Sequence, residues 1–373
     1  MFTVIRNIFI FPICLIWLNT AIAENKILIP AAPSVAAKNF ILIDFHSGKV
    51  LAEKKADEKV APASLTKIMT VYVIFRELAA GRLSLDEKVR ISKKAWQTPG
   101  SRMFVEVNKK VSVEDLLKGV IIQSGNDASV ALAEHVAGDE ATFAAMMNQH
   151  AERLGMTSSN FENSMGLSSK NHYVTVRDLV KLTTAIISEF PDYYKWDSEK
   201  EFTFNKITQP NRNKLLWRDK SVDGVKTGYT EEAGYCMVAS AKREEMRLIS
   251  VVMGTSSANA RANESQTLLN YGFRFFETHK LYKGKEQLAD PRVWKGDSKK
   301  LSLGLIEDLY VTIPRRHYND LKLEVKFDKK IIAPVNEGDS FGTFNVSLAG
   351  DIVVNKPLIA LNSVAKGGLI DRL

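Results

Sequence analysis

A serine and a lysine lie three residues apart in the stretch Ala61–Thr70, which reads Ala-Pro-Ala-Ser-Leu-Thr-Lys-Ile-Met-Thr. Residues at positions i and i+3 of a helix share one face, with their Cβ atoms about 5–6 Å apart. The amine of Lys67 could therefore act as a base for the hydroxyl of Ser64, which would make Ser64 a nucleophile. The pattern has only two fixed positions and recurs at Ser363–Lys366. Ser64 could equally be a helix cap and Lys67 a solvated charge.

The residues around this pair predict a buried helix. Pro62 can end the preceding extended segment, residues 69–78 are almost wholly apolar, and Gly81 can end the helix. We therefore expect a helix that begins at Ser64 and carries both Ser64 and Lys67 on its first turn.

Two further polar motifs follow along the chain. Ser124–Asn126, which reads Ser-Gly-Asn, interrupts two apolar helical stretches, so its side chains either cap helices or enter a cavity. Lys226–Gly228, which reads Lys-Thr-Gly, ends a strand-like run. A lysine there is either an ordinary edge-strand residue or one beside which a substrate backbone can lie. Each motif taken alone has an ordinary structural explanation.

The elements that must position these motifs are helices and antiparallel strands. A hairpin is expected at residues 39–52, short strands at Val89–Lys94 and Met103–Val107, and a meander of strands at residues 224–253. Ser112 with Asp115, and Thr175 with Asp178, predict capped helix starts. Further helices are expected at residues 128–136, 141–154 and 264–276. This order predicts an α/β (α+β) domain with a mainly antiparallel sheet and a cluster of helices.

The remainder of the chain predicts a second domain of a different class. Apolar and polar residues alternate at residues 321–327 and 344–348, and glycines punctuate these runs. We expect a small all-β domain at residues 285–362 after a first domain at residues 24–280, and a short tail at residues 363–373.

The first 23 residues predict a secretory signal peptide. Arg6 precedes the apolar run Ile8–Leu18, and Ala21–Ala23 provides a small-x-small cleavage site. An uncleaved anchor is the alternative, and in both cases the bulk of the chain lies outside the cytoplasm. The formal net charge of +8 then favours anionic envelope surfaces or acidic substrates over nucleic acid, for which we find no motif. The six histidines lack ligand spacing, so we expect no metal and no cofactor.

The three motifs become informative in combination. Ser-x-x-Lys, Ser-x-Asn and Lys-Thr-Gly occur in the order found in penicillin-interacting serine enzymes. The chain resembles the low-molecular-mass D-alanyl-D-alanine carboxypeptidases, which are serine-type penicillin-binding proteins. The resemblance extends over roughly residues 35–370 and is strongest in four stretches: Gln123–Ala128, Asp223–Gly228, Tyr271–Glu277 and Leu309–Arg315.

The resemblance implies a catalytic role for three side chains, those of Ser64, Lys67 and Ser124. Ser64 would attack the carbonyl between the two terminal D-alanines of a peptidoglycan stem peptide, and Lys67 would accept its proton. Burial and the nearby cation Lys226 would both lower the pKa of Lys67. Ser124 would relay a proton to the departing amine.

Recognition would fall to a second set of residues. The backbone N–H groups of Ser64 and Tyr229 would form the oxyanion hole, by analogy with the family. Asn126 would hold the amide on the acyl side. Lys226, Thr227 and Arg261 would bind the terminal carboxylate, and Arg261 is matched only by its offset from Glu264. Gly228 would contribute to substrate binding beside them. Position 229 is a tyrosine, whereas some relatives carry histidine.

The implied partners are the stem peptide as substrate and β-lactam antibiotics as inhibitors that acylate Ser64. We expect a periplasmic enzyme that can associate peripherally with the outer face of the inner membrane. Relatives usually continue into an amphipathic membrane-binding helix, and five residues after Gly368 are too few for one. Either the sequence is truncated or association with the membrane is weak.

Three alternatives remain open. A β-lactamase on the same scaffold would need a glutamate to activate water, and Glu162 is the candidate, although its surroundings lack the Glu-Leu-Asn pattern. A D,D-endopeptidase would use the same chemistry on a larger leaving group. A non-catalytic cell-wall-binding protein could keep the fold, but the intact Ser64, Lys67 and Ser124 argue against it.

Overall fold

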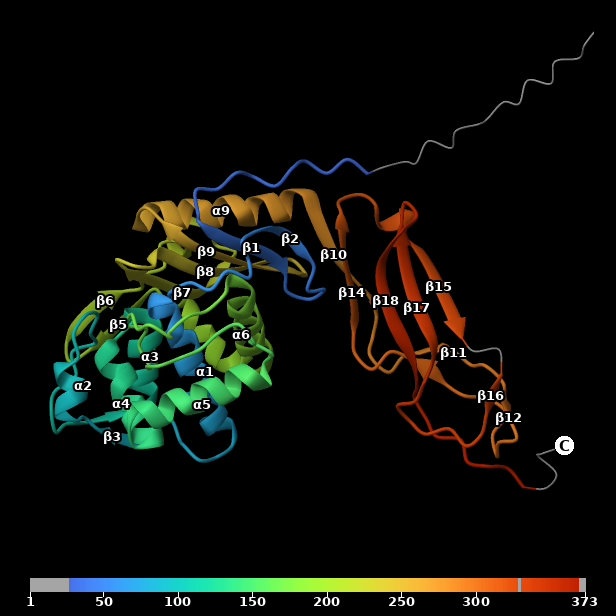
Figure 1. The fold of residues 1–373 in the computed structure, drawn as a ribbon, viewed down its shortest axis with the longest axis horizontal. Coiled ribbons are helices and arrows are strands. Elements are labelled where there is room, and N and C mark those ends of the chain that lie inside the picture. Colours follow the sequence, from blue (N-terminus) through green and yellow to red (C-terminus); the bar gives the residue numbers. More distant parts are fainter. Residues whose placement is uncertain (1–26, 328–329, 369–373) are drawn as a thin grey trace, which may run out of the picture.

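The chain folds into two parts, a larger one of helices and strands and a slender one of strands (Figure 1). A computed structural model describes residues 27–327 and 330–368. The predicted signal peptide at residues 1–23 lies outside the described residues. The two parts meet where α9 (Ala258–Phe275) runs into β10 (Phe276–Tyr282).

The larger part is built on one five-stranded antiparallel sheet, as the sequence predicts. Its strand order is β2-β1-β9-β8-β7, so β7 lies at an edge. The bounds of the strands in this order are Val50–Lys54, Asn39–Asp44, Met246–Thr255, Gly234–Arg243 and Val222–Thr230.

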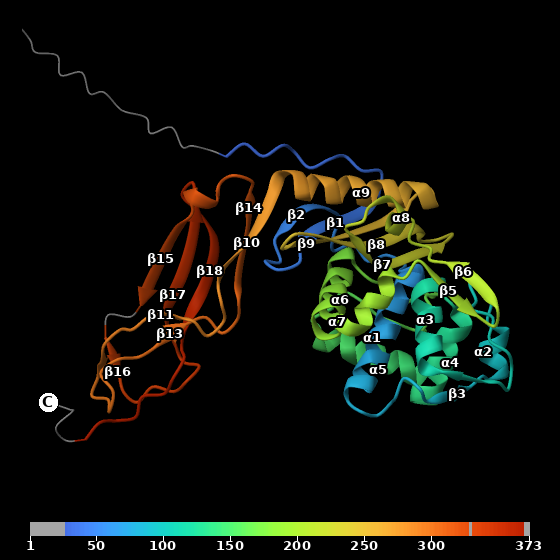
Figure 2. The same ribbon diagram turned by 180° about the vertical axis from the view of Figure 1, so that it is seen from behind.

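Both faces of this sheet are covered by helices (Figures 1 and 2). Because side chains alternate along a strand, β1 sends Phe40 and Leu42 to the core shared with α9. Ile41 and Ile43 enter the core on the opposite face, which the helical cluster fills. The central strands are therefore apolar on both sides, and their backbone positions are held rigidly.

The helical cluster contains the motif-bearing helices and their supports. Ser112 Oγ caps α3 by accepting a bond from the N–H of Asp115, and Thr175 caps α6 in the same way with Asp178, as predicted. The longer helices, with the short η1 turn that precedes α1, are η1 (Ala63–Leu65), α1 (Thr66–Ala79), α3 (Val113–Gln123), α4 (Asn126–Ala137), α5 (Glu140–Arg153) and α6 (Val176–Glu189). The shorter elements are α2 (Lys93–Gln97), α7 (Pro191–Tyr194), η2 (Lys195–Ser198), β5 (Glu201–Phe204), β6 (Ile207–Pro210) and α8 (Leu215–Arg218).

The expected strand at Met103–Val107 is wrong. The partner of β3 (Lys88–Arg90) is β4 (Lys110–Ser112). The N–H groups of residues 103–105 instead donate to the carboxylate of Asp127, at 2.9–3.2 Å. A side chain thus satisfies the backbone donors that a strand partner would otherwise take. Helix α9 also begins earlier than expected, where Ser257 caps it through the N–H of Ala260.

The slender part is all-β, as predicted, but its limits differ from those expected. Residues 276–280, assigned to the first domain, lie in β10, which pairs with β14 (Leu309–Pro314). No linker marks this boundary because α9 continues directly into β10. Val364 and Lys366, assigned to the tail, form bridges with Val335 and Gly296. The remaining elements are β11 (Gln287–Ala289), β12 (Val293–Trp294), β13 (Leu303–Gly304), η3 (Tyr318–Asp320), β15 (Lys322–Phe327), β16 (Ile331–Ile332), β17 (Ser340–Leu348) and β18 (Asp351–Ala360).

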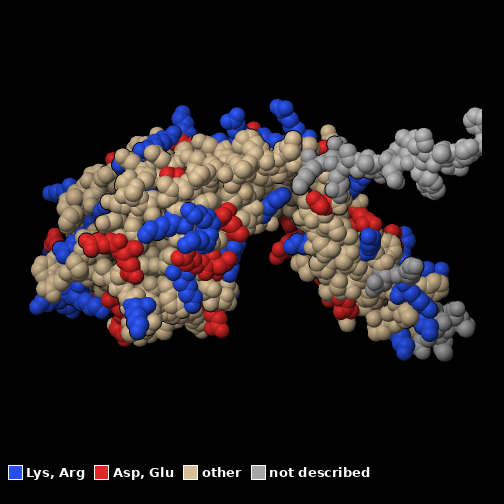
Figure 3. All heavy atoms as spheres, turned by 45° about the horizontal axis from the view of Figure 1, so that its top comes forward, with Lys and Arg blue, Asp and Glu red and all other residues tan. Residues whose placement is uncertain are grey.

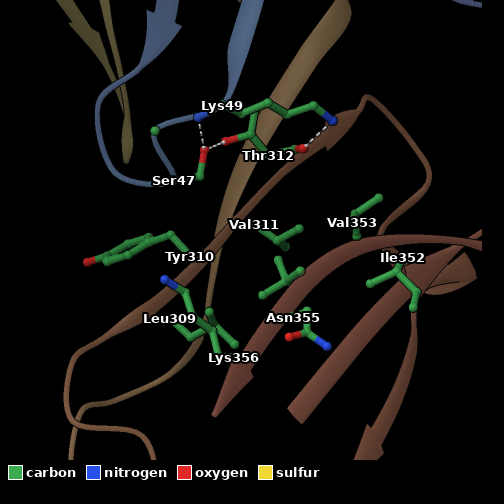
Figure 4. A pocket seen from close by; sticks show the side chains of 12 residues that line it. Ser47, Lys49, Leu309, Tyr310, Val311, Thr312, Ile352, Val353, Asn355 and Lys356 are labelled. Carbon is green, nitrogen blue, oxygen red and sulfur yellow. Dashed lines mark hydrogen bonds between the residues drawn. The ribbon is translucent and has the colours of Figure 1, made fainter. Parts of the chain in front are cut away.

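A hydrogen-bond network fastens the two parts together (Figure 4). Ser47 Oγ lies 2.6 Å from Thr312 Oγ1, and Lys49 Nζ donates to the Thr312 carbonyl at 3.0 Å. Asp44 is fully buried and accepts from the N–H and hydroxyl of Ser47 and from Thr278 Oγ1, at 2.7–2.9 Å. A pocket of about 500 Å³ opens beside this network. One carboxylate therefore ties the β1–β2 hairpin to β10.

Replacing Asp44 with alanine is expected to destabilise this junction. Hydrogen bonds to a charged group contribute about 1.5–3 kcal/mol, and the variant leaves buried hydroxyls without their acceptor. The midpoint of urea unfolding should fall for D44A and stay unchanged for D351A, which alters an exposed carboxylate on β18. Equal midpoints for the two variants would contradict this account of the junction.

Candidate active site

The fold brings the three predicted motifs to one place. Ser64 lies on η1, Lys67 on the first turn of α1, Ser124 between α3 and α4, and Lys226 on the edge strand β7. Helices α1, α3 and α4 lie below the sheet, beside its edge strand β7 (Figures 1 and 2). The second Ser-x-x-Lys match, residues 363–366, lies at the far end of the slender part and does not join them.

Ser64 and Lys67 form the hydrogen-bonded pair that the spacing predicts. Lys67 Nζ donates to Ser64 Oγ at 3.1 Å, and the lysine side chain is fully buried. Its amine also donates to Asn126 Oδ1 and to the Met165 carbonyl, both at 2.7 Å. The expected helix start is shifted, because Ser64 sits on η1 just before α1. Ala63 holds this turn with a left-handed φ of 49°.

Ser124 and Lys226 form a second serine–lysine pair. Lys226 Nζ donates to Ser124 Oγ at 2.8 Å and to the Thr227 carbonyl at 3.1 Å. Ser124 has a φ of 61°, so the serine itself, and not Gly125, takes the left-handed conformation at the end of α3. Such a conformation costs about 1–3 kcal/mol and is held by the surrounding structure. It aims the hydroxyl back toward β7.

The third motif brings the backbone of β7 against the nucleophile. A Cβ atom placed on Gly228 would lie 3.2 Å from both the Ser64 nitrogen and Ala63 Cβ, so only glycine fits without displacement. Arg261, from α9, donates to the Gly228 carbonyl at 2.8 Å and is buried. The ring of Tyr229 is half exposed and stacks on Tyr235 with centroids 4.3 Å apart.

The electrostatic environment favours the neutral form of the Lys67 amine. Burial and the guanidinium of Arg212 lower the pKa of Lys67 to about 7, and Asp127 opposes the shift. Burial, Lys67 and Arg212 also push the pKa of Lys226 well below its usual value. The expected cation was Lys226, but a lysine whose own pKa is so low exerts little positive charge on its neighbour. The positive charge that lowers the pKa of Lys67 is instead that of Arg212.

Several contributors were missed in the sequence. Arg212 donates from Nε to the Gln123 carbonyl at 3.0 Å, and only its place in the polar triplet Asn211–Asn213 could have drawn attention to it. Asn126 Nδ2 donates to the Pro99 carbonyl at 2.6 Å. The backbone carbonyls of Pro99 and Met165 could not be predicted as site groups, because every residue carries such a carbonyl whatever its type.

The arrangement suits nucleophilic acyl transfer. A serine hydroxyl lies within reach of a largely neutral amine, a second hydroxyl lies beside another amine, and strand backbone runs past the nucleophile. Within the described ranges, no group of three or more histidine, cysteine, aspartate or glutamate residues could hold a metal ion.

Replacing Gly228 with alanine is expected to slow the reaction of Ser64 roughly tenfold or more, because β7 must move away from the nucleophile and small displacements are costly. The rate of labelling of Ser64 by a fluorophosphonate reagent measures this effect. The matched control is E231A, which alters an exposed residue in the β7–β8 turn. Labelling of G228A at the rate of the unaltered protein would refute the close-approach argument.

Comparisons with known proteins agree with the site. The chain matches the D-alanyl-D-alanine carboxypeptidase family over residues 26–257 and the C-terminal domain of penicillin-binding protein 5 over residues 276–366. It is 47% identical over 350 residues to D-alanyl-D-alanine carboxypeptidase DacC of Escherichia coli (strain K12), covering 92% of this chain and 88% of the relative.

Solved structures extend the likeness to three dimensions. Penicillin-binding protein 5 from Haemophilus influenzae superposes with a TM-score of 0.88 at 40% identity, covering 90% of this chain and all of that one. The ampicillin-bound form of penicillin-binding protein D2 from Listeria monocytogenes matches with a TM-score of 0.60 at 31% identity, covering 65% and 100%. The resemblance inferred from the motifs is confirmed: the chain belongs to the D-alanyl-D-alanine carboxypeptidase family of serine peptidases and carries the C-terminal domain of penicillin-binding protein 5.

Proposed function

We propose that this enzyme removes the terminal D-alanine from peptidoglycan stem peptides through an acyl-enzyme on Ser64. The main observation behind this proposal is the burial and lowered pKa of the Lys67 amine beside Ser64. This amine is buried, has a pKa of about 7 and lies 3.1 Å from Ser64 Oγ. A base with a pKa near the working pH is the most effective proton acceptor.

The first half-reaction joins the acyl group to Ser64. Ser64 Oγ attacks the carbonyl carbon of the penultimate D-alanine as Lys67 Nζ takes the hydroxyl proton. The N–H groups of Ser64 and Tyr229 stabilise the oxyanion, a role supported by the approach of β7 at Gly228. As the peptide C–N bond breaks, the departing amine needs a proton.

Ser124 is suited to deliver that proton. Its hydroxyl accepts from Lys226 Nζ at 2.8 Å, so its own hydrogen is free to point into the site. The proton taken by Lys67 passes through Ser124 to the amine. In the second half-reaction water attacks the ester, its proton returns through the same groups, and the shortened peptide leaves.

Substrate recognition uses the end of β7 and the start of α4. Lys226, Thr227 and Arg261 bind the terminal carboxylate, and the substrate backbone lies beside Gly228. The hydrogen bond from Arg261 to the Gly228 carbonyl supports the position of Arg261 at this end of β7. Asn126 is held by Lys67 and Pro99, and the second hydrogen of its amide can bind the amide on the acyl side.

The same site accounts for reaction with β-lactams. A penicillin carries a strained amide and a carboxylate that mimic the terminal dipeptide, so it acylates Ser64 and leaves slowly. Glu162, the candidate base of a β-lactamase, is instead bound by the Ser169 hydroxyl and the Asn171 N–H. This arrangement favours the carboxypeptidase over the lactamase. Endopeptidase activity on cross-links uses the same chemistry and remains the second candidate.

We further propose that the enzyme is exported to the periplasm and associates weakly with the outer face of the inner membrane. Among the described residues, none of the helices combines the length and apolar character needed to cross a bilayer. The net charge of +8 favours an anionic surface. On the face shown in Figure 3, however, basic side chains are interspersed with acidic ones, which agrees with weak association.

Replacing Ser64 with alanine is expected to abolish D-alanine release from a diacyl-D-Ala-D-Ala peptide and to abolish the penicillin adduct. Release is followed with a D-amino-acid oxidase assay, and the adduct is mapped by mass spectrometry. The control is S363A, in the second Ser-x-x-Lys match, which should keep both activities. An adduct on another residue would overturn the assignment, and rapid β-lactam turnover without D-alanine release would favour the lactamase.

The pH dependence should follow the neutral form of Lys67. Activity should rise as pH increases through about 7, because the amine must lose its proton before it can act as a base. In R212M the nearby positive charge is gone, the pKa of Lys67 increases, and the acidic limb of kcat should move to higher pH. R218M removes an exposed charge on α8 and serves as the control. A limb that stays in place in R212M would contradict this origin of the shift.

A further inference from the structure

Asp197 is a buried carboxyl group that the mechanism above does not use. It lies on η2, is 6% exposed, and packs against β7 at Gly224. A Cβ atom on Gly224 would lie 3.1 Å from Asp197 Cβ. The missing side chain lets η2 approach the strand two residues before Lys226.

A small cavity is lined by Asp197 and by both lysines of the site. Its volume is about 10 Å³, at the lower limit for one water molecule. Asp197, Lys67 and Lys226 are its only ionisable lining residues, and aliphatic side chains of α1, α3, α6 and β7 form the rest of its wall. Asp197 thus shares an otherwise apolar space with the two amines.

The two lysines have different acidic neighbours. Both amines lie within hydrogen-bond distance of neutral oxygen atoms, those of Ser64, Asn126 and Met165 for Lys67 and those of Ser124 and Thr227 for Lys226. The pKa of each lysine is lowered overall, and one carboxyl group at longer range partly opposes that shift. For Lys67 this group is Asp127, and for Lys226 it is Asp197. The carboxylate of Asp127 is already held by backbone N–H groups. Asp197 is therefore the acidic partner of Lys226.

The surroundings favour the neutral form of both groups, a protonated carboxyl group on Asp197 and an uncharged amine on Lys226. Burial and the charge of Asp223 raise the pKa of Asp197 well above its usual value, and burial with Lys67 and Arg212 lowers that of Lys226. Two neutral groups are favoured in an apolar space over two separated charges. A neutral amine, however, cannot make a charge-assisted bond to a carboxylate.

We propose that Asp197 reversibly transfers its proton to Lys226 when the terminal carboxylate of a stem peptide binds beside that lysine. The O–H bond of Asp197 breaks, an N–H bond forms on Lys226, and one water molecule in the cavity carries the proton between them. The protein takes up no net proton, and the proton returns to Asp197 when the product leaves. Asp197 is a positioning residue, since it acts through Lys226 and does not touch the substrate. The proposal rests on the proposed role of Lys226 in binding the carboxylate.

The variant D197N tests the proposal because it keeps the shape of the side chain and removes its transferable proton. Lys226 must then take a proton from solvent, so KM for the peptide should rise about tenfold per pH unit above the lowered pKa of Lys226. KM of the unaltered enzyme should stay level over the same range. The acidic limb of kcat, which reports Lys67, should not move.

The other ionisable groups around Asp197 must stay unchanged in this experiment. Lys67 and Lys226 line the same cavity, Asp223 acts on the Asp197 carboxyl group, and Tyr194 packs against the same position of β7. One step further away, Arg247 pairs with Asp223, Arg212 acts on Lys226, and Lys118 pairs with Glu199. D192N makes the same change in an exposed carboxylate five residues away and should behave like the unaltered enzyme. The penicillin adduct on Ser64 and the thermal midpoint verify that D197N is folded, and D197S is the second variant if it is not.

A spectroscopic measurement follows the proton directly. In the S64A background a D-Ala-D-Ala peptide binds without turnover, and its binding should remove the infrared carbonyl band of a protonated carboxylic acid. The band change should be absent in S64A/D197N. A KM of D197N that is raised equally at every pH, or that follows the unaltered enzyme, overturns the proposal, as does an unchanged band. Absence of D-alanine release by the unaltered enzyme would instead overturn the proposed function.

Discussion

The active site depends on keeping a lysine amine neutral inside the protein. An exposed lysine is almost fully protonated at pH 7 and cannot accept a proton from a serine. Complete burial removes the water that would stabilise the charged form, and Arg212 adds repulsion. The neutral acceptors around Lys67 Nζ fix its direction without supplying the negative charge that would restore its usual pKa. The surrounding helices make this burial possible.

The edge strand β7 supplies extended backbone and a second lysine to the site. Its backbone passes the nucleophile at Gly228, and it carries Lys226 into contact with Ser124. Because both faces of the sheet are packed with helices, β7 has little freedom to shift relative to Ser64. Strain at Ala63 and Ser124 is tolerated for the same reason: rigid neighbours hold both turns.

The slender part stands apart from the reacting groups but is not loosely attached. Asp44, at the end of β1, binds Ser47 and Thr278, so the sheet that supports the site also anchors β10. The unbroken passage from α9 into β10 adds a covalent connection without a flexible linker. The orientation of the β part is thus coupled to the body of the enzyme.

Local sequence patterns predicted the candidate reactive residues and most of the elements. The motifs around Ser64, Ser124 and Lys226 predicted a nucleophile, a proton relay and a strand that binds the carboxylate, because each combines a reactive residue type with a local pattern of helix, turn or strand. Alternation and capping predicted the antiparallel sheet and the helix starts at Ser112 and Thr175. Each of these patterns lies within one short segment of the chain, so it can be recognised without knowledge of the fold.

Only the tertiary structure decided which groups from distant segments act on Lys67. Arg212 and the Met165 carbonyl reach it through folding, and a backbone carbonyl has no residue type by which it could be recognised. The false strand at residues 103–107 has the same cause, since Asp127 takes the backbone donors that a neighbouring strand would have used. Contacts between distant segments depend on how the elements pack together, and the spacing of residues within one segment does not reveal this packing.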